Sequence, residues 1–491
     1  MKKRLIVVGA GLGGLSLALR AVSAGWQVTV LERSHQAGGK MNILAQDGYR
    51  FDTGPSLITL PHVFRQMFEE CGVGTGSLRF RRLQPLTQYR FPDGERITYP
   101  DKLPAIASML ERLEPDGGRG YWRLMATAAK LFELSQRTFF QSSPFELPTS
   151  RQLQALVRSL RWFPLRNAWG NYSRTVERHI HSSYIRQIFN RYPTFVGSSP
   201  YRSPATLLVI PYLEFAHGGW YVDGGLYRII ETILGALRER GVMIATNADV
   251  VSIIERNRRV RGVCLASGDV VEADVVAFNG DATRAHTLLG MPPPPRLPER
   301  SMSGVVFLIG LRRQLPADVF HHTIAFSTDY RREFVELFDR MEFPSEPTVY
   351  LNVTSKTDST TAPPSGETLF VMANAPAVEG RQWEHAIPML WERMMRVLER
   401  SGIHIVESDI AVRSVWTPEH FERTYGMPGG SIYGFASHSY RTAFLRHPLR
   451  DRNVRGLYYV GGSTHPGGGT PMVVLSSKLV FDLIKRHEMD S

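Results

Sequence analysis

The N-terminal stretch of the chain changes its hydrophobic period twice within a few dozen residues. The run RLIVV, from Arg4 to Val8, is short, continuous and apolar, as expected of a strand that a parallel sheet buries on both faces. The segment LGGLSLALRAVSAG then carries leucine and alanine at helical spacing as far as Gly25, where a glycine predicts the end of a helix. QVTVLE predicts a second strand that ends on Glu32. The pattern therefore predicts a strand–helix–strand unit.

The turn between the first strand and the helix contains three glycines at G-x-G-x-x-G spacing, Gly9, Gly11 and Gly14. In such a unit the first glycine allows a tight turn, the second lets a pyrophosphate approach the backbone, and the third lets helix and strand pack closely. The phosphates then lie at the helix N-terminus. Glu32 stands where an acid accepts from ribose hydroxyls, and its charge disfavours the 2′-phosphate of NADP. The unit predicts a dinucleotide site.

The same N-terminal segment also has features of a secretory signal, namely a basic start, an apolar middle and the small residues AVSA. The glycine spacing favours the dinucleotide site over that interpretation. Elsewhere the sequence has no uninterrupted apolar run of about 18 residues, so we expect no spanning helix. Its two cysteines, Cys71 and Cys264, exclude a disulfide framework and a cysteine-based metal site, and they favour a reducing compartment. We expect no metal.

The residues after Glu32 favour FAD over NAD. A plain NAD domain would continue into another strand–helix unit, whereas here a second glycine pair is followed by a hairpin around Asp47-Gly48 and the turn DTGPS. This arrangement resembles the FAD-binding oxidoreductases of the amine oxidase and carotenoid desaturase superfamily. In them the segment E-R-x-x-x-x-G-G-[KR] wraps the adenosine and pyrophosphate, and D-x-G-P-S approaches the flavin. The resemblance makes these residues candidates for the cofactor site: Arg33, Gly39, Lys40, Met41, Gly54, Pro55 and Ser56.

Later segments return to the predicted dinucleotide site. A helix is expected from Leu226 to Arg240, and in the strand that follows it Val250 matches the position whose backbone clasps adenine in this superfamily. A β-meander then leads to the buried strand ADVVAFN. Near the C-terminus, LYYV predicts a strand, GGSTHPGGGTP a glycine loop, and the residues from about Pro471 a helix. Strand, glycine loop and helix N-terminus again suit an anion or a polar ring edge.

In the superfamily this second glycine loop lies along the ribityl chain and the flavin ring, which adds Gly462 and Met472 to the candidate residues. The helix dipole can stabilise negative charge on the reduced flavin. His465 lies in the same loop. It is either a base that works near neutral pH or a loop histidine bonded to backbone, and we assign no catalytic residue.

The net charge of +12 indicates an anionic partner surface or simply a soluble basic protein. The segment from Arg151 to Ile180 contains six arginines, two tryptophans and one acid. Basic and aromatic residues interleaved in this way suit a membrane interface, and an ordinary helical lid with a basic outer face is the alternative. Nucleic acid is disfavoured because no reading motif accompanies the charge.

Four further segments extend the resemblance over nearly the whole chain and make it specific to bacterial carotenoid desaturases of the phytoene type. They are VGSSPYRSPATLLVIPYLEFAHGGWYVDGG, VYLNVTSKTDSTTAPPSGETLFVMANAP, GGSIYGFASHSYRTAFLRHP and YVGGSTHPGGGTPM. The last of these and AFLRHP look more like hydroxycarotenoid 3,4-desaturases than like phytoene desaturases. Diaponeurosporene oxidases, which oxidise a terminal methyl group, share much of the same pattern.

The resemblance implies an α/β fold of the amine oxidase and glutathione reductase type, with a Rossmann-type FAD domain, a mixed-sheet substrate domain and a helical, membrane-associated lid. The FAD domain would be assembled from residues 1–75, 221–300 and 421–491, and the substrate regions from 76–220, which carries the lid, and 301–420. The implied activity is FAD-dependent desaturation of a carotenoid drawn from an anionic membrane, with oxygen or a quinone as electron acceptor. The implied location is cytoplasmic, on the inner face of the cell membrane.

Three alternatives stay open. A terminal-methyl carotenoid oxidase would place oxygen at a chain end. A flavin amine oxidase would need an aromatic cage and a small polar pocket. A lipid-chain escort protein, as in prenyl-GTPase chaperones, would share the fold and lack a competent set of FAD loops.

Overall fold

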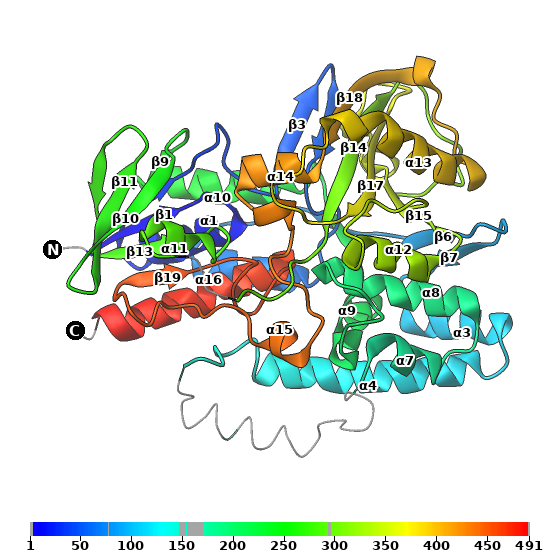
Figure 1. Ribbon diagram of the computed structural model, residues 1–491, viewed down its shortest axis with the longest axis horizontal. Coiled ribbons are helices and arrows are strands. Elements are labelled where there is room, and N and C mark those ends of the chain that lie inside the picture. The colour runs from blue at the N-terminus through cyan, green and yellow to red at the C-terminus, as the bar shows by residue number, and fades with distance from the viewer. Residues whose placement is uncertain (1–2, 77, 147–153, 155–169, 293–295, 490–491) are drawn as a thin grey trace.

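The computed structural model describes residues 3–76, 78–146, 154, 170–292 and 296–489. A parallel five-stranded sheet lies at one end of the molecule (Figure 1), in the order β19-β13-β1-β2-β9. It is assembled from distant parts of the sequence: β1 Arg4–Val8, β2 Gln27–Leu31, β9 Met243–Ala245, β13 Val275–Phe278 and β19 Leu457–Tyr459. The predicted N-terminal and C-terminal strands are confirmed and share this sheet.

The helices that pack with this sheet are those that the sequence predicts. The N-terminal unit contains α1 Leu12–Ser23, the middle helix is α10 Tyr227–Glu239, and the C-terminal helix is α16 Thr470–Ile484, continued by the π-helical turn Lys485–Met489. Together with α2 Pro61–Glu70 they form one hydrophobic core with the sheet. The N-terminal apolar segment is thus the buried centre of a folded domain.

Two smaller sheets accompany the first. The predicted hairpin is β3 Ile43–Gln46 and β4 Tyr49–Asp52. The predicted meander is an antiparallel sheet of β10 Val250–Arg256, β11 Arg259–Leu265 and β12 Val270–Glu272, followed after β13 by α11 Arg284–Leu288.

A seven-stranded mixed sheet forms the second half of the molecule, in the order β18-β14-β17-β16-β15-β6-β7. Its strands are β6 Thr87–Arg90, β7 Arg96–Tyr99, β14 Ser303–Leu311, β15 His322–Ala325, β16 Val349–Asn352, β17 Glu367–Ala375 and β18 Ile410–Trp416. The helices between and after these strands are α12 Tyr330–Phe338, α13 Ile387–Arg400, α14 Pro418–Tyr425 and α15 Tyr440–Phe444. Short 3-10 turns lie at Thr354–Lys356, Ser359–Thr361, Glu384–Ala386, Glu407–Asp409 and Pro428–Gly430.

The described helices between β7 and β8 gather on one side of that sheet (Figure 1). They are α3 Leu103–Leu113, α4 Gly117–Arg137, α7 Tyr172–Glu177, α8 Ser183–Arg191 and α9 Val209–His217, with 3-10 turns at Tyr192–Val196 and Ala205–Leu208. Residues 76–220 are not purely helical, because β6 and β7 join the large sheet and β5 Phe80–Arg82 pairs with β8 Trp220–Val222. Most of the basic segment 151–180 lies outside the described residues.

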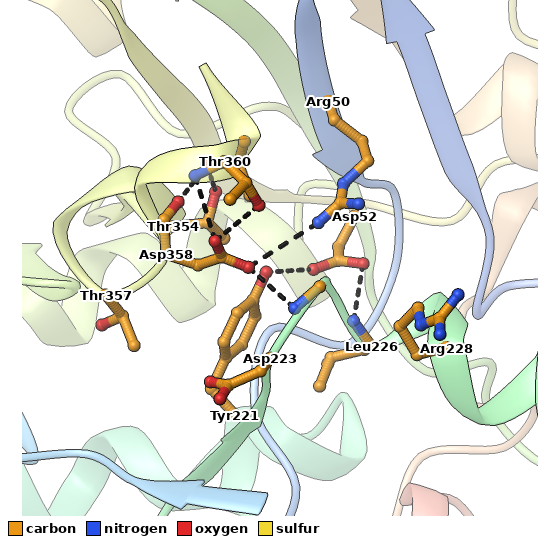
Figure 2. A network of polar contacts seen from close by, with 12 residues as sticks. Arg50, Asp52, Tyr221, Asp223, Leu226, Arg228, Thr354, Thr357, Asp358 and Thr360 are labelled. Atoms are coloured by element: carbon orange, nitrogen blue, oxygen red, sulfur yellow. Dashed lines mark hydrogen bonds and ion pairs between the residues drawn. The ribbon is translucent and has the colours of Figure 1, made fainter. Parts of the chain in front are cut away.

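A polar network ties the hairpin to both halves of the molecule (Figure 2). The Tyr221 hydroxyl and the Leu226 backbone N–H donate to the two carboxyl oxygens of Asp52, each at 3.0 Å. Asp358, from the large-sheet half, accepts from the Gly224 N–H at 2.8 Å and lies 3.8 Å from the Arg50 guanidinium. Burial raises the pKa of Asp52 from 3.8 to about 6, although these hydrogen bonds oppose the shift.

We expect this carboxyl to make stability depend on pH. Because the folded state holds the Asp52 proton more tightly than the unfolded state, the free energy of unfolding falls as the pH rises from 3.8 to about 6, by at most about 1.4 kcal/mol per pH unit. Asp52→Asn removes the titrating group and flattens this slope. Urea unfolding midpoints measured across that range test it, with Asp47→Asn, an exposed position in the same hairpin, as the control. A slope unchanged by Asp52→Asn would contradict the assignment.

Candidate functional site

A single cavity of about 1110 Å³ connects the two halves of the molecule. At one end its wall is formed by the glycine turn after β1, the ends of β2 and β13, and the loop before α16. At the other end it reaches β15, β16, β17 and the helices α4 and α9. The volume exceeds the roughly 300–1,000 Å³ of ordinary ligand pockets. The cavity can therefore hold more than one small molecule.

The structure brings the predicted cofactor residues together on this cavity, with the exception of Gly14. The residues on its wall are Gly9, Gly11, Glu32, Arg33, Gly39, Lys40, Met41, Gly54, Pro55, Ser56, Val250, Gly462 and Met472. Gly14 instead lies under the turn, where a Cβ atom would meet the Gly9 carbonyl oxygen at 2.3 Å and Val7 at 2.9 Å. This contact matches the helix–strand packing expected of the third glycine.

Two glycines of the first turn are required for different reasons, Gly9 for its backbone conformation and Gly11 for the space around it. Gly9 has φ +100, which favours glycine. Gly11 has an extended backbone, φ −75, so a side chain is conformationally allowed there, but a Cβ would meet the Asn279 amide oxygen at 2.8 Å. Gly11 also caps α1, whose first N–H groups have no partner within the helix. The turn leaves bare backbone and a helix N-terminus on the cavity wall, which suits a pyrophosphate.

Glu32 lies at the end of β2 with both carboxyl oxygens anchored. Oε2 accepts from the Ala10 backbone N–H at 2.7 Å, and Oε1 accepts from the Ser34 N–H at 2.9 Å and its hydroxyl at 2.7 Å. The carboxylate therefore fixes the glycine turn and still borders the cavity.

The second glycine pair lies against the first turn. A Cβ on Gly39 would be 2.9 Å from the Gly11 Cα. The adjacent Lys40 donates from Nζ to the Ile432 carbonyl oxygen at 2.6 Å, and burial lowers its pKa from 10.5 to about 8. Lys40 thus supplies a positive charge to the cavity at neutral pH.

The C-terminal glycine loop closes the same region from the other side. A Cβ on Gly13 would be 3.2 Å from the Gly461 Cα and 3.1 Å from the Val473 side chain. Asn279, directly after β13, donates from Nδ2 to the Val460 carbonyl at 2.8 Å, and its Oδ1 is buried without a partner. Asn279 was missed from the sequence, although its place at the carboxyl end of a parallel strand is where such sites form.

His465 does not reach the cavity. Its side chain is buried, and its ring Nε2 lies 2.7 Å from the Phe139 carbonyl oxygen. Burial lowers its pKa to about 4. The geometry favours the loop histidine bonded to backbone over the base.

Arg446 is a buried cation on the cavity wall that the sequence did not single out. Its guanidinium donates to the Tyr433 carbonyl and the Ser437 hydroxyl, each at 3.0 Å, and lies beside the backbone of Gly467 in the glycine loop. Burial lowers its pKa to about 10, so it stays charged at neutral pH. No carboxylate in the described part of the chain forms an ion pair with it. A buried charge of this kind calls for an anion in the cavity.

A family model described as flavin containing amine oxidoreductase matches residues 12–480. The chain belongs to this family. Its cofactor is a flavin, and the glycine turns, the anchored Glu32 and the neighbouring helix N-termini of α1 and α16 fit the dinucleotide form, FAD.

Similar proteins match from end to end. A 1-hydroxycarotenoid 3,4-desaturase of Flavobacterium sp. (strain P99-3) is 32% identical over 491 residues, 98% of this chain and 99% of that protein. A 4,4'-diapolycopene oxygenase of Methylomonas sp. is 32% identical over 490 residues, 98% of each. Among solved structures, wild-type putrescine oxidase bound to putrescine superimposes with a TM-score of 0.61 at 15% identity, over 99% of this chain and 100% of that one. The last match supports the fold alone.

Two further findings concern membrane-spanning helices and metal ions. In the ranges given above, none of the helices combines the length and the apolar character needed to cross a bilayer. Among the same residues, no group of three or more histidine, cysteine, aspartate or glutamate side chains is arranged to hold a metal ion.

Proposed function

We propose that this protein is an FAD-dependent carotenoid desaturase that introduces C=C bonds into a long polyene, with the 3,4-position of a hydroxylated carotenoid favoured. The observation that carries the proposal is the continuous cavity. Its dinucleotide end is lined by glycines and charged groups. Towards the helices its wall is mainly apolar, with side chains such as Leu134, Phe140, Ile210 and Leu213. The end-to-end match to a desaturase of a hydroxycarotenoid supports the same conclusion.

FAD, when bound, would accept a hydride from carbon and so take up the electron pair of the C–H bond that breaks. The chain's own part is to align the polyene, exclude water and stabilise the negative charge of the reduced cofactor. The first two tasks fall to the apolar wall, and the third to Lys40 and Arg446. The second hydrogen leaves the polyene as a proton. The positive charge that develops on the polyene is delocalised along it, so a strong enzymatic base is unnecessary. The electron acceptor that reoxidises the cofactor would be oxygen or a quinone.

Each predicted cofactor residue on the cavity wall has a role in this proposal. Gly9, Gly11, Gly39 and Gly462 would leave room for the pyrophosphate and ribityl chain, and Glu32 would bind the ribose. The backbone of Val250 would hold the adenine. The remaining candidates border the adenosine, pyrophosphate or flavin: Arg33, Lys40, Met41, Gly54, Pro55, Ser56 and Met472.

Expression in a bacterium that makes hydroxylated neurosporene or lycopene tests the reaction. The proposal predicts a pigment that has lost two hydrogens and absorbs at longer wavelength, identified by chromatography and mass spectrometry. A gain of oxygen at a chain end would instead assign the protein to the terminal-methyl carotenoid oxidases. That second candidate has specific support in the Methylomonas relative, which is a 4,4'-diapolycopene oxygenase.

The proposal also places the protein on the inner, cytoplasmic face of the cell membrane, because a carotenoid is insoluble and must be drawn from lipid. The support is the basic and aromatic composition of residues 151–180, together with the net charge of +12. The domain boundaries given by the resemblance remain part of the proposal, with 76–220 as the region that contacts lipid.

Reversing three arginines of that segment, Arg158→Glu, Arg161→Glu and Arg166→Glu together, is expected to weaken binding to anionic liposomes. The loss is roughly 1 kcal/mol or more for each residue that touches lipid. Co-sedimentation with liposomes measures it, and neutral liposomes serve as the control. Unchanged sedimentation of the variant would show that this segment does not contact the membrane.

A further inference from the structure

Two charged side chains lie on the part of the cavity wall that the helices form. Arg191 is the last residue of α8, and Glu214 lies in α9. Among the cavity-lining residues that the structure describes between 183 and 217, they are the charged ones. Their neighbours there are apolar groups such as Phe195, Ile210 and Leu213. Charges in an apolar wall require a partner of defined chemistry.

The guanidinium of Arg191 is held among aromatic rings and keeps an unused donor. It lies 4.7 Å from the centre of the Phe195 ring and 5.9 Å from that of Tyr350. Its Nη1 atom is buried and has no hydrogen-bond partner. Burial lowers its pKa, but Glu214 and the surrounding tyrosines together raise it by more, so the side chain stays charged.

Glu214 keeps an unused acceptor. Its side chain is 1% exposed and recessed in the wall. Oε1 accepts from the Tyr192 hydroxyl at 2.9 Å, whereas Oε2 has no partner. Burial raises the pKa of this carboxyl, and the charge of Arg191 opposes the rise. Arg191 and Glu214 therefore interact electrostatically. Nη1 of Arg191 and Oε2 of Glu214 are still without a hydrogen-bond partner.

A short chain of contacts links this pair to the segment expected at the flavin. The Tyr350 hydroxyl donates to the Ser56 hydroxyl oxygen at 2.6 Å, and the Tyr350 ring is one of those beside Arg191. Ser56 belongs to the turn DTGPS. A polar group bound between Arg191 and Glu214 would thus lie on a part of the substrate near the reacting carbons.

The chemistry of the missing partner follows from the two unmatched atoms. A hydroxyl group accepts from one neighbour and donates to another, so it satisfies both. A carbonyl or carboxylate only accepts, and would leave the Glu214 oxygen unpaired or repelled. A hydrocarbon end would leave both groups unpaired, at a cost for each.

We propose that Arg191 and Glu214 bind the hydroxyl group of a hydroxylated polyene, Arg191 as donor and Glu214 as acceptor, and thereby select hydroxylated substrates. This inference rests on the proposed function. Because a site built to bind a hydroxyl rejects the analogue without one strongly, the hydroxylated polyene is expected to bind at least about tenfold more tightly.

The test measures binding of two acyclic polyenes of equal conjugation, one with a tertiary hydroxyl and one without, to the flavin-loaded protein. Both are supplied in the same neutral liposomes, and quenching of flavin fluorescence gives the dissociation constants. Arg191→Met and Glu214→Met should each reduce the preference. The double variant should bind the unhydroxylated polyene at least as well as the unchanged protein does, since two apolar groups replace two unmatched polar ones. Glu384→Met, an exposed glutamate in the large-sheet half that does not border the cavity, is the control.

Loss of the preference in both single variants, with recovery of the unhydroxylated polyene in the double variant, is the expected result, and a misfolded protein cannot give it. Equal binding of the two polyenes to the unchanged protein would overturn the inference and leave the proposed function standing. Binding of neither polyene would contradict the proposed function, and the inference with it.

Discussion

Replacing Gly11 by valine is expected to abolish FAD binding. The backbone at Gly11 tolerates a side chain, since φ is −75, so the effect comes from space alone. The new side chain would point at the Asn279 amide, 2.8 Å from its Cβ, on the wall where the pyrophosphate must approach. The flavin absorbance of the purified variant, relative to total protein, measures the loss.

A matched control separates loss of the cofactor from loss of the fold. Gly235 lies in α10, has no neighbouring atom within 4 Å of an added Cβ, and does not border the main cavity. Gly235→Val should keep full flavin content. Normal flavin content in Gly11→Val would show that the glycine turn after β1 does not hold the pyrophosphate.

Replacing Arg446 by methionine is expected to lower the midpoint potential of the bound flavin. The guanidinium is a buried positive charge without a carboxylate partner among the described residues, next to the C-terminal glycine loop. It therefore favours the form of the cofactor that carries more negative charge. Unit charges several ångströms apart interact by about 2–3 kcal/mol at an effective dielectric constant of about 20, which corresponds to about 40–60 mV for a two-electron couple.

Redox titration against a reference dye measures that shift. Arg446→Lys keeps the charge and should restore most of the potential, which a purely structural role in holding Tyr433 and Ser437 would not predict. Arg452→Met removes an exposed arginine from the same part of the chain and should leave the potential unchanged. An unaltered potential in a flavin-loaded Arg446→Met protein would assign Arg446 to the fold instead.

Local signals were enough to predict the dinucleotide half of the fold. Runs such as RLIVV and ADVVAFN, the helix ending near Gly241 and the glycine turns depend on neighbours in sequence, and the structure contains them as β1, β13 and α10. The strand pairing of the large sheet was harder to predict from the sequence. β6 pairs in parallel with β15, more than two hundred residues away, and nothing in a short strand such as TQYR specifies so distant a partner.

The same distinction holds for the site. Glycines were found because close approach of a backbone demands them, and twelve other candidates in addition to Gly9 lie on the cavity wall. Arg191, Glu214 and Arg446 were missed because an arginine or a glutamate is recognised as part of a site only when it is known to be buried with a polar atom or charge left unpaired. Those properties arise from the packing of α8, α9 and the loop after α15 against distant strands, and sequence patterns do not report them.

Anaerobic mixing of the flavin-loaded protein with a hydroxylated acyclic polyene tests the central claim most directly, because it asks whether the polyene itself reduces the cofactor. The account predicts that the flavin absorbance bleaches as the polyene gains one double bond for each flavin reduced. It also predicts that a diamine such as putrescine leaves the flavin oxidised. Bleaching by the amine and none by the polyene would contradict the account and assign the cavity to amine oxidation.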